Sequence, residues 1–293
     1  MRINIINLDK DSWILTKFAR KLFFHCRILG HDTYLSKKSR SNVDVNHYII
    51  FLFQTENVRD YNLKSINTSL LTHVNDNFRY KKIKAISKFI DAGITFSDHH
   101  LKHIKSKSLG IKNLFAVLPP CDNDLKLKKI NFGFFTNLYT DGRKAEKFFF
   151  DTVISLNSDL IKFTIIGKGW SNIVKELRGK GYEIDYQRFF FRKRYIRKLS
   201  NIDYLIYLGN DEGSMSFLDA LQLGIKTIMI PQGFQKDLEK FITHKLKTDL
   251  SNFRVTLEKI IEDRVKYLNV RKKLTWENYA KEHIKIWKSL IRK

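Results

Sequence analysis

Along the N-terminal half of the chain, short apolar runs typical of strands alternate with amphipathic segments typical of helices. The run at 48–53 is apolar throughout, which is typical of a parallel strand covered on both faces. A basic amphipathic stretch at 13–26, with Ser12 as candidate N-cap, predicts the first helix. The alternation favours a Rossmann-like domain. Its strands are expected at 2–7, 30–35 (after a turn), 48–53, 69–73, 93–97 and 116–118, and its other helices at 83–91 and 98–107.

This alternation breaks between Pro119 and Lys129, where two prolines precede a polar and basic run. We place a domain boundary there, with one domain at 1–125 and a second at 126–275. The second half repeats the alternation and closes with an amphipathic helix within 276–293. Its strands are expected at 130–135, 162–166, 182–186, 204–208 and 227–230, and its helices at 143–156, 171–178, 189–199, 235–241, 250–263 and 276–291.

Length and composition agree with two folded domains. The chain has 293 residues, of which 43% are hydrophobic and 13% aromatic, and these fractions exclude a disordered chain. No apolar run approaches the roughly 20 residues that span a bilayer, and the N-terminal residues lack the apolar core of a signal peptide. Cys26 and Cys121 are too few for a disulfide framework or a cysteine metal site, so we expect reduced thiols and a cytoplasmic protein.

The formal net charge of +24 adds information about the partners of the protein. Lysines and arginines are spread along the whole chain, which argues against a nucleic-acid-binding arm. A charge of this size favours anionic partners, and three classes fit: the anionic inner leaflet of a membrane, a lipid diphosphate acceptor, or nucleic acid. Charge alone does not choose among them.

A stretch at 210–231 has the form of a turn and a helix between two buried strands. It follows the apolar run at 204–208, and its helix has Ser214 or Ser216 as candidate N-cap and Gly224 at its end. Such a unit is half of a doubly wound sheet, in which ligands bind outside the carboxyl ends of the strands. The exposed amides at the start of the helix suit an anion such as phosphate.

Two carboxylates, Asp211 and Asp219, lie eight positions apart around this turn. Carboxylates do not neutralise phosphate, but they accept hydrogen bonds from hydroxyl groups such as those of a sugar or ribose. The stretch resembles the donor-binding signature of GT-B glycosyltransferases of the group 1, retaining kind, in which two glutamates eight apart flank a Gly-rich turn. Residues 219–224, Asp-Ala-Leu-Gln-Leu-Gly, stand where that family has Glu-Ala-x-x-x-Gly. Glu212 with Gly213 also resembles the family's Glu-Gly, so Asp211 and Glu212 both remain candidates for the first acid.

The resemblance covers 133–287 and implies the GT-B fold. This fold is α/β, with two Rossmann-like domains facing a central cleft and a C-terminal helix crossing back to the N-terminal domain. In that family a Gly-Arg pair and a following lysine hold the donor diphosphate, and Gly142-Arg143 match the pair. The lysine is Lys144 or Lys147, of which Lys147 lies one helical turn beyond Arg143 and is expected to face the same way.

Further site residues follow from the same resemblance. His73 resembles a histidine that approaches the donor sugar, and Gly167 with Gly169 resembles a turn beside the donor. Asp219 is expected to hold the ribose, and Asp211 or Glu212 the hydroxyls of the sugar. Catalytic roles are thereby implied for His73, Arg143, Lys147 and Asp211. Donor-binding roles are implied for Gly142, Lys144, Gly167, Gly169, Glu212, Gly213, Ser214, Met215, Ser216 and Asp219.

The function expected from these features is transfer of a sugar from a nucleoside-diphosphate-sugar donor to a hydroxyl group of a saccharide or lipid-linked saccharide. The resemblance implies retention of anomeric configuration and no bound metal or cofactor. His99, His100 and His103 lack a spacing-matched carboxylate or cysteine and are interpreted as a solvated helical face. The charge and the family together suggest bacterial surface-polysaccharide or lipopolysaccharide synthesis, with the protein peripheral to the inner face of the cell membrane.

Two other functions stay open. A basic α/β protein could bind nucleic acid through the aromatic and basic segment 189–195, although Asp211 and Glu212 would repel a phosphate backbone. A non-catalytic GT-B subunit is the second alternative, because aspartates replace the family's glutamates. The sequence does not reveal the donor sugar, the base, the acceptor, the linkage or the oligomeric state.

Overall fold

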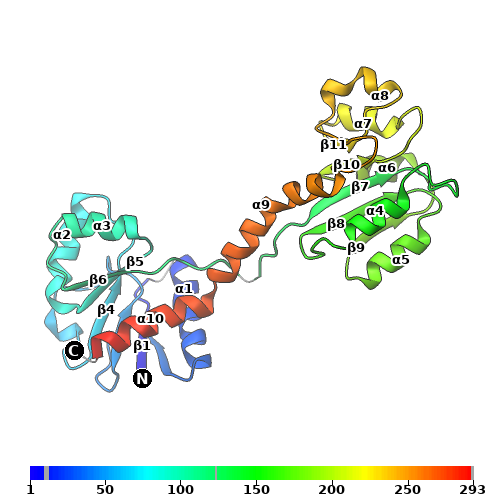
Figure 1. The fold of residues 1–293 in the computed structure, drawn as a ribbon. Coiled ribbons are helices and arrows are strands. Elements are labelled where there is room, and N and C mark those ends of the chain that lie inside the picture. Colours follow the sequence, from blue (N-terminus) through cyan, green and yellow to red (C-terminus); the bar gives the residue numbers. More distant parts are fainter. Residues whose placement is uncertain (10–12, 123, 292–293) are drawn as a thin grey trace. The chain divides into compact units, whose positions relative to one another are not determined.

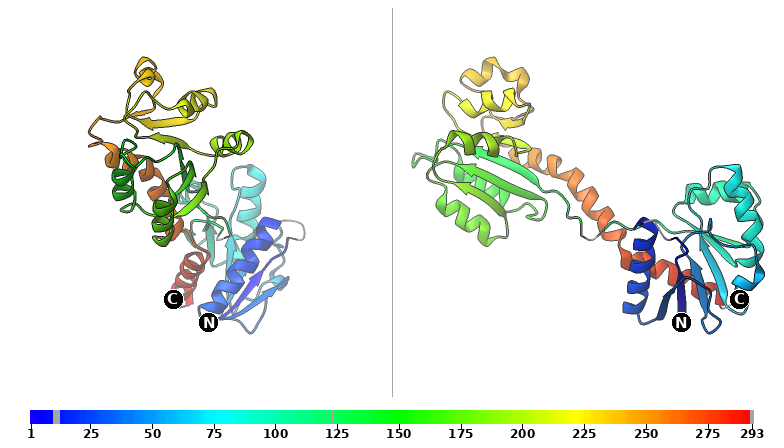
Figure 2. Two further views of the ribbon diagram at one scale, coloured as in Figure 1. Left: turned by 90° about the vertical axis from the view of Figure 1, so that its right-hand side faces the viewer. Right: turned by 180° about the vertical axis from the view of Figure 1, so that it is seen from behind.

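The computed structural model describes residues 1–9, 13–122 and 124–291. The chain divides into two compact units, Met1–Leu125 together with Val270–Lys293, and Lys126–Asn269. Each unit contains one sheet of six strands, all of them parallel, with helices on both faces (Figures 1 and 2). The expected α/β class, with two Rossmann-like domains, is therefore confirmed. The candidate N-cap Ser12 lies outside the described residues.

The first unit has the strand order β2-β1-β3-β4-β5-β6, which reverses between β1 and β3. Helices α1 and α10 pack on one face of this sheet, and α2 and α3 pack on the other. Its elements are β1 (Arg2–Ile6), α1 (Trp13–Ile28), β2 (Asp32–Ser36), β3 (Val45–Tyr48), η1 (Val58–Asp60), β4 (Ile66–Leu70), α2 (Asn77–Ile86), η2 (Ser87–Phe89), β5 (Ala92–Thr95), α3 (Asp98–Ser106), β6 (Asn113–Ala116) and α10 (Trp276–Ile291).

Helix α10 carries the chain back to this first unit after the second unit is complete. Its side chains Trp276 and Trp287 are almost fully buried there, in the same cluster as Phe18 of α1 and Ile94 of β5. The indole Nε1 of Trp287 also donates a hydrogen bond to the Thr68 hydroxyl of β4 at 3.1 Å. The expected return of the C-terminal helix to the N-terminal domain is thus confirmed.

Strands β3 and β4 begin three residues earlier than the sequence predicted, and the predicted strand at 48–53 is wrong for all but its first residue. The reason is that both strands bury polar side chains which satisfy one another. Asn46 accepts a hydrogen bond from the Asn4 amide of β1 at 2.8 Å, and the His47 ring Nδ1 lies 2.9 Å from the Thr68 hydroxyl. Hydropathy alone assigns such residues to loops.

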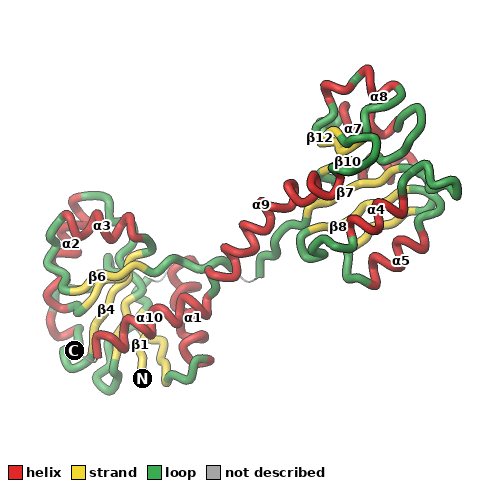
Figure 3. Tube along the Cα trace, viewed as in Figure 1, coloured by secondary structure: helices red, strands yellow, loops and turns green. Residues whose placement is uncertain are grey.

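The second unit has the strand order β12-β11-β10-β7-β8-β9, which reverses between β7 and β10. Relative to the chain this is the Rossmann order 3-2-1-4-5-6 of dinucleotide-binding domains. Figure 3 distinguishes the strands from the helices that cover them, α4, α5 and α9 on one face and α6 and α7 on the other. Its elements are β7 (Ile130–Phe135), α4 (Glu146–Val153), β8 (Ile161–Ile166), α5 (Ser171–Gly179), β9 (Glu183–Gln187), α6 (Arg192–Leu199), β10 (Tyr204–Tyr207), α7 (Met215–Gln222), β11 (Lys226–Met229), α8 (Phe234–Asp237), η3 (Glu239–Phe241), β12 (His244–Lys245) and α9 (Phe253–Lys273).

Candidate functional site

A hollow of about 560 Å³ lies at the carboxyl ends of β7, β8 and β10. This is the point where the strand order of the second unit reverses, and open α/β sheets bind their ligands at such points. The loop after β7, the turn after β8 and the first residues of α6 and α7 form its walls. Seven of the residues predicted to bind the donor border it: Lys144, Gly167, Gly213, Ser214, Met215, Ser216 and Asp219.

Lys144 provides a buried positive charge in the wall of this hollow, with only 8% of the residue exposed. Its ammonium Nζ donates a hydrogen bond to the Tyr207 hydroxyl at 2.6 Å and forms an ion pair with Asp211. Ala145, in the left-handed conformation with φ at 50°, turns the chain between Lys144 and α4. Gly209 leaves room for the lysine stem, because a Cβ atom there would lie 2.9 Å from its Cδ.

Asp211 lies behind Lys144 and fixes its position. The carboxylate accepts hydrogen bonds from Lys144, from the Tyr207 hydroxyl and, at 3.1 Å, from the backbone N–H of Gly213. Burial disfavours the ionised carboxylate, yet the bonds from Lys144 and Tyr207 outweigh it and lower the pKa of Asp211 from its ordinary value. Burial and the bond to Asp211 raise the pKa of the Tyr207 phenol, which therefore stays neutral. Asp211 is not among the described residues that border the hollow.

Asp219 of α7 also lies in the wall of this hollow. Its Oδ2 accepts a hydrogen bond from the Tyr195 hydroxyl of α6 at 2.5 Å, and the Arg192 guanidinium lies 3.5 Å from the same oxygen. A carboxylate offers about four acceptor positions, so these two donors leave capacity for hydroxyl groups of a ligand. Burial, together with the bond to Asp219, raises the pKa of Tyr195 and keeps it a donor.

The amino end of α7 faces this hollow without a capping side chain. Ser214 holds the N-cap position, but its hydroxyl bonds the Ser216 hydroxyl at 2.8 Å and makes no capping hydrogen bond to the helix. Of the two predicted N-cap candidates, Ser214 is thus confirmed in that position, although its side chain does not cap the helix. Ser216 donates to the Phe135 carbonyl at 3.1 Å and ties the helix to β7. Backbone N–H groups at such an end are available to an anion.

The turn after β8 packs directly against the loop after β7. Gly167 has φ at 148°, and a Cβ atom there would lie 2.1 Å from the Thr136 carbonyl oxygen. The backbone N–H of Lys168 donates to Asn137 Oδ1 at 2.8 Å. Trp170 is 1% exposed and its indole donates to the Thr136 carbonyl at 2.7 Å, so this ring belongs to the core and is not free to stack on a base.

Replacing Gly167 by alanine should therefore deform the site. The added methyl group meets main chain that cannot move aside, and the φ angle is unfavourable for alanine, so we expect a loss of about 3 kcal/mol or more in the free energy of unfolding. Gly142→Ala is the matched control. Gly142 also has a positive φ of 71° but open space around it, so a loss of only about 1 kcal/mol is expected. Urea unfolding of the two variants measures the difference, and equal losses would contradict this account.

Arg143 and Lys147 lie outside the hollow. The Arg143 guanidinium is half-exposed, pairs with Asp141 at 2.9 Å and lies 4.2 Å above the ring of Tyr139, which borders the hollow. Lys147 does not share a helical face with Arg143, contrary to the prediction, because α4 begins only at Glu146. Lys147 is exposed and forms no ion pair within the described parts of the chain. Their catalytic roles stay predictions.

Three other predicted donor-binding residues lie near the hollow without bordering it. Gly142 is exposed in the loop before Arg143, and Gly169 has φ at 88° against the backbone of Leu138. Glu212 has an exposed side chain, while its carbonyl oxygen accepts a hydrogen bond from the Phe234 N–H at 3.2 Å. Of the two candidates for the first acid, Asp211 is the one that the structure connects to the hollow, through Lys144.

His73 belongs to the first unit, in the loop that follows β4. Its side chain is exposed and its backbone is left-handed, with φ at 54°. A residue other than glycine in this conformation is uncommon and marks a position held by its surroundings. The predicted catalytic role of His73 stays a prediction.

Sequence reasoning missed the aromatic part of the wall. The sequence predicted Tyr207 only as part of a buried strand, and Tyr195 with Arg192 as part of an aromatic and basic segment that could bind nucleic acid, not as donor-site residues. The available signal was the tyrosine at the last position of β10, three positions before the motif begins at 210, because the carboxyl ends of parallel strands lie on the ligand side.

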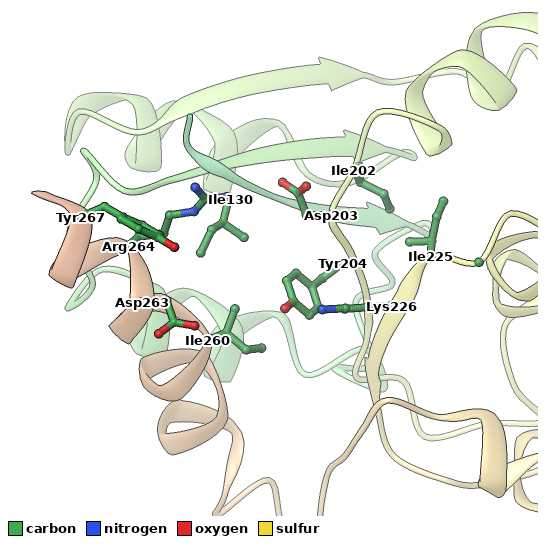
Figure 4. A pocket seen from close by; sticks show the side chains of 11 residues that line it. Ile130, Ile202, Asp203, Tyr204, Ile225, Lys226, Ile260, Asp263, Arg264 and Tyr267 are labelled. Atoms are coloured by element: carbon green, nitrogen blue, oxygen red, sulfur yellow. The ribbon is translucent and has the colours of Figure 1, made fainter. Parts of the chain in front are cut away.

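A second hollow, of about 510 Å³, lies at the other end of the strands, between α9 and the amino ends of β7, β10 and β11 (Figure 4). Asp203 in its wall already accepts a hydrogen bond from the Asn131 N–H at 2.8 Å. Asp263 likewise pairs with Lys266 at 3.4 Å. The two acids of this hollow thus have partners within the chain. Gly224, the last residue of the motif, lines this hollow, but none of the residues predicted to bind the donor does.

The described residues contain no group of three or more histidine, cysteine, aspartate or glutamate side chains that could hold a metal ion. Among them there is also no helix with the length and apolar character needed to cross a membrane.

No family model and no curated protein matches the sequence. Solved structures with similar chains include an alpha-glucosyltransferase in complex with UDP and a DNA containing a HMU base, at 12% identity over 100% of both chains with a TM-score of 0.38. HepE of Anabaena in complex with UDP-glucose matches at 10% identity over 100% of this chain and 98% of that chain, with a TM-score of 0.35. S. aureus TarM matches at 11% identity, covering 94% of this chain and 59% of that chain, with a TM-score of 0.33. The chain spans 60% of the length of the chain it matches in the GtfA/B complex. These values are too low to transfer an activity or a substrate.

Proposed function

We propose that the chain binds a nucleoside-diphosphate sugar in the hollow of its second unit and transfers the sugar to a hydroxyl group of an acceptor. The observation that carries this proposal is the buried Lys144, held by Asp211 and Tyr207 at the point where the strand order reverses. A lysine this deeply buried beside an open hollow offers one charge to a ligand of opposite charge.

The other walls of the hollow suit the remaining parts of such a ligand. The uncapped amino end of α7 adds backbone donors for phosphate oxygens. Asp219 offers carboxylate oxygens to hydroxyl groups of a ribose, and Phe190 with Ile166 offers apolar surface to a base. The motif at 210–224 supports the extension from nucleotide to nucleotide sugar, through its resemblance to the GT-B signature.

In the proposed reaction the bond between the sugar's anomeric carbon and the donor phosphate breaks, and a bond to the acceptor oxygen forms. The departing diphosphate gains negative charge, which Lys144 and the α7 amides stabilise. Asp211 and Tyr207 hold Lys144 in position before the donor binds. When the donor binds, the lysine ammonium interacts with both Asp211 and the donor phosphate. We further propose retention of configuration, with the acceptor proton passing to the departing phosphate, no catalytic metal, and an acceptor from surface-polysaccharide or lipopolysaccharide synthesis.

Thermal unfolding with UDP, GDP, ADP and CDP tests the binding step. A nucleotide at about 100 times its Kd stabilises the folded state by about 2.7 kcal/mol, which corresponds to a rise in Tm of roughly 5–10 °C. The matching monophosphate should give a smaller rise, because it presents less negative charge to Lys144. If none of the diphosphates raises Tm, the proposal is wrong.

Release of the nucleotide from the matching donor sugar separates the alternatives. Binding together with donor turnover supports a transferase, whereas binding without turnover favours a non-catalytic subunit. Binding of oligonucleotides in place of mononucleotides favours the nucleic-acid-binding alternative.

A further inference from the structure

Three consecutive phenylalanines are exposed in the loop between β9 and α6. Phe189, Phe190 and Phe191 expose 51%, 60% and 55% of their surface. The loop is held in place, since Gln187 donates to the Phe189 carbonyl at 2.6 Å and the Tyr195 N–H donates to the Phe191 carbonyl at 2.8 Å. A fixed segment that keeps adjacent aromatic side chains in water is a surface for an apolar partner.

Positive charge surrounds these rings. Arg188 precedes them, and Arg192, Lys193 and Arg194 follow at the start of α6. Arg192 pairs with Asp219, whereas Arg188, Lys193 and Arg194 form no ion pair with any described residue. The segment therefore presents apolar groups and uncompensated cations together.

This combination fits the interface of an anionic membrane better than a nucleic acid. Stacking of nucleotide bases needs open ring faces. Here Arg188 and Lys168 lie 5.3 and 5.8 Å from the centre of the Phe189 ring, and Arg194 lies 5.6 Å from that of Phe191. The Phe190 ring lies 5.0 Å from the Tyr195 ring, so each of the three rings already has a neighbour. Rings flanked by basic side chains can instead enter the headgroup region while the cations meet lipid phosphates.

We propose that the segment 188–194 is a membrane-docking surface for bilayers containing anionic phospholipid. Phe189 and Phe191 would enter the boundary between headgroups and acyl chains, and Arg188, Lys193 and Arg194 would contact phosphate groups. Because Phe190 and Arg192 border the hollow described above, docking sets this hollow beside the lipid surface. Membrane binding of this kind requires no bound nucleotide, so its test is independent of donor binding.

Co-sedimentation with vesicles of equal parts phosphatidylcholine and phosphatidylglycerol tests the apolar contribution. Phe189→Ser/Phe191→Ser should weaken partitioning by about tenfold. The matched control is Phe78→Ser/Phe241→Ser, which removes two phenylalanines that are 72% and 52% exposed elsewhere. The control should partition like the unaltered protein, and circular dichroism checks that each variant is folded.

A second pair of variants tests the charge. Lys193→Gln/Arg194→Gln should weaken binding by about thirtyfold at low salt, and Lys175→Gln/Lys180→Gln, a pair of exposed lysines on and just after α5, should change it by less. Vesicles of phosphatidylcholine alone should bind weakly.

Equal losses in a variant and its control would overturn the proposal, as would absence of vesicle binding by the unaltered protein. Tighter binding to an oligo(dT) probe than to vesicles, with the same dependence on Phe189 and Phe191, would assign the surface to nucleic acid instead.

Discussion

Lys144→Met should reduce the affinity for the nucleoside diphosphate that stabilises the protein by about 100-fold, because it removes the buried charge that faces the ligand. The same change leaves Asp211 without its cation, so we also expect the free energy of unfolding to fall by about 2 kcal/mol. Calorimetric titration with the diphosphate measures the first effect, and urea unfolding measures the second.

Two further variants separate binding from stability. Lys147→Met removes an exposed lysine three residues away and should change both quantities little. Lys144→Met/Asp211→Asn removes both charges, so part of the stability should return while the affinity stays low. If Lys147→Met rather than Lys144→Met abolishes binding, the assignment of Lys144 is wrong.

Acidification from pH 6.5 to 4 should destabilise the first unit by about 3 kcal/mol through His283 alone. Burial lowers the pKa of His283 from 6.5 to about 4, and it lowers that of His47 as well. The two rings lie 5.2 Å apart, and neither Nε2 atom has a hydrogen-bond partner among the described residues. As the pH falls below 6.5 the unfolded chain takes up the proton first. The contribution to stability is therefore present above pH 6.5 and is lost as the pH approaches 4.

Urea unfolding across this pH range, followed through Trp287, whose ring lies beside both histidines, measures the effect. Carboxyl groups titrate over the same range, so the informative quantity is the difference between variants. His283→Leu should flatten the pH dependence, whereas His99→Leu, at an exposed position, should leave it unchanged. Identical pH profiles for all three proteins would contradict the expectation.

The sequence predicted the second unit more accurately than the first, and the cause lies in the polar residues of the strands. The strand at 130–135 of the second unit was predicted with its observed bounds, because its apolar positions follow one period throughout. In the first unit the helix at 276–291 was predicted equally well for the same reason. In β3 and β4 the buried side chains include Asn46, His47 and Thr68, which are satisfied only by partners on neighbouring strands. Such pairing joins residues that are far apart in the chain, so no local pattern of apolar and polar residues predicts these strands.

At the site, sequence patterns predicted the region correctly but not which of its cations borders the hollow. The glycines and acids of the motif predicted the turn at 210–224. Lys144 was favoured less than Lys147, because the helix was expected to begin at 143. Because Ala145 adopts a left-handed conformation, the helix begins at Glu146. Alanine has no preference for this conformation, so the sequence does not indicate the later start. The link from Lys144 to Tyr207 joins residues 63 positions apart, so only the folded sheet reveals it.

The two segments of the first unit, Met1–Leu125 and Val270–Lys293, have a consequence for synthesis on the ribosome. Domains usually fold in the order in which they emerge, N-terminal first. Here the core of the first unit lacks Trp276 and Trp287 until the last of its helices has been translated, whereas the second unit is complete by Asn269. The second unit should thus reach its native state before the first. Until α10 is translated, the first unit exposes the apolar surface that this helix later covers, and we expect chaperones to bind that surface.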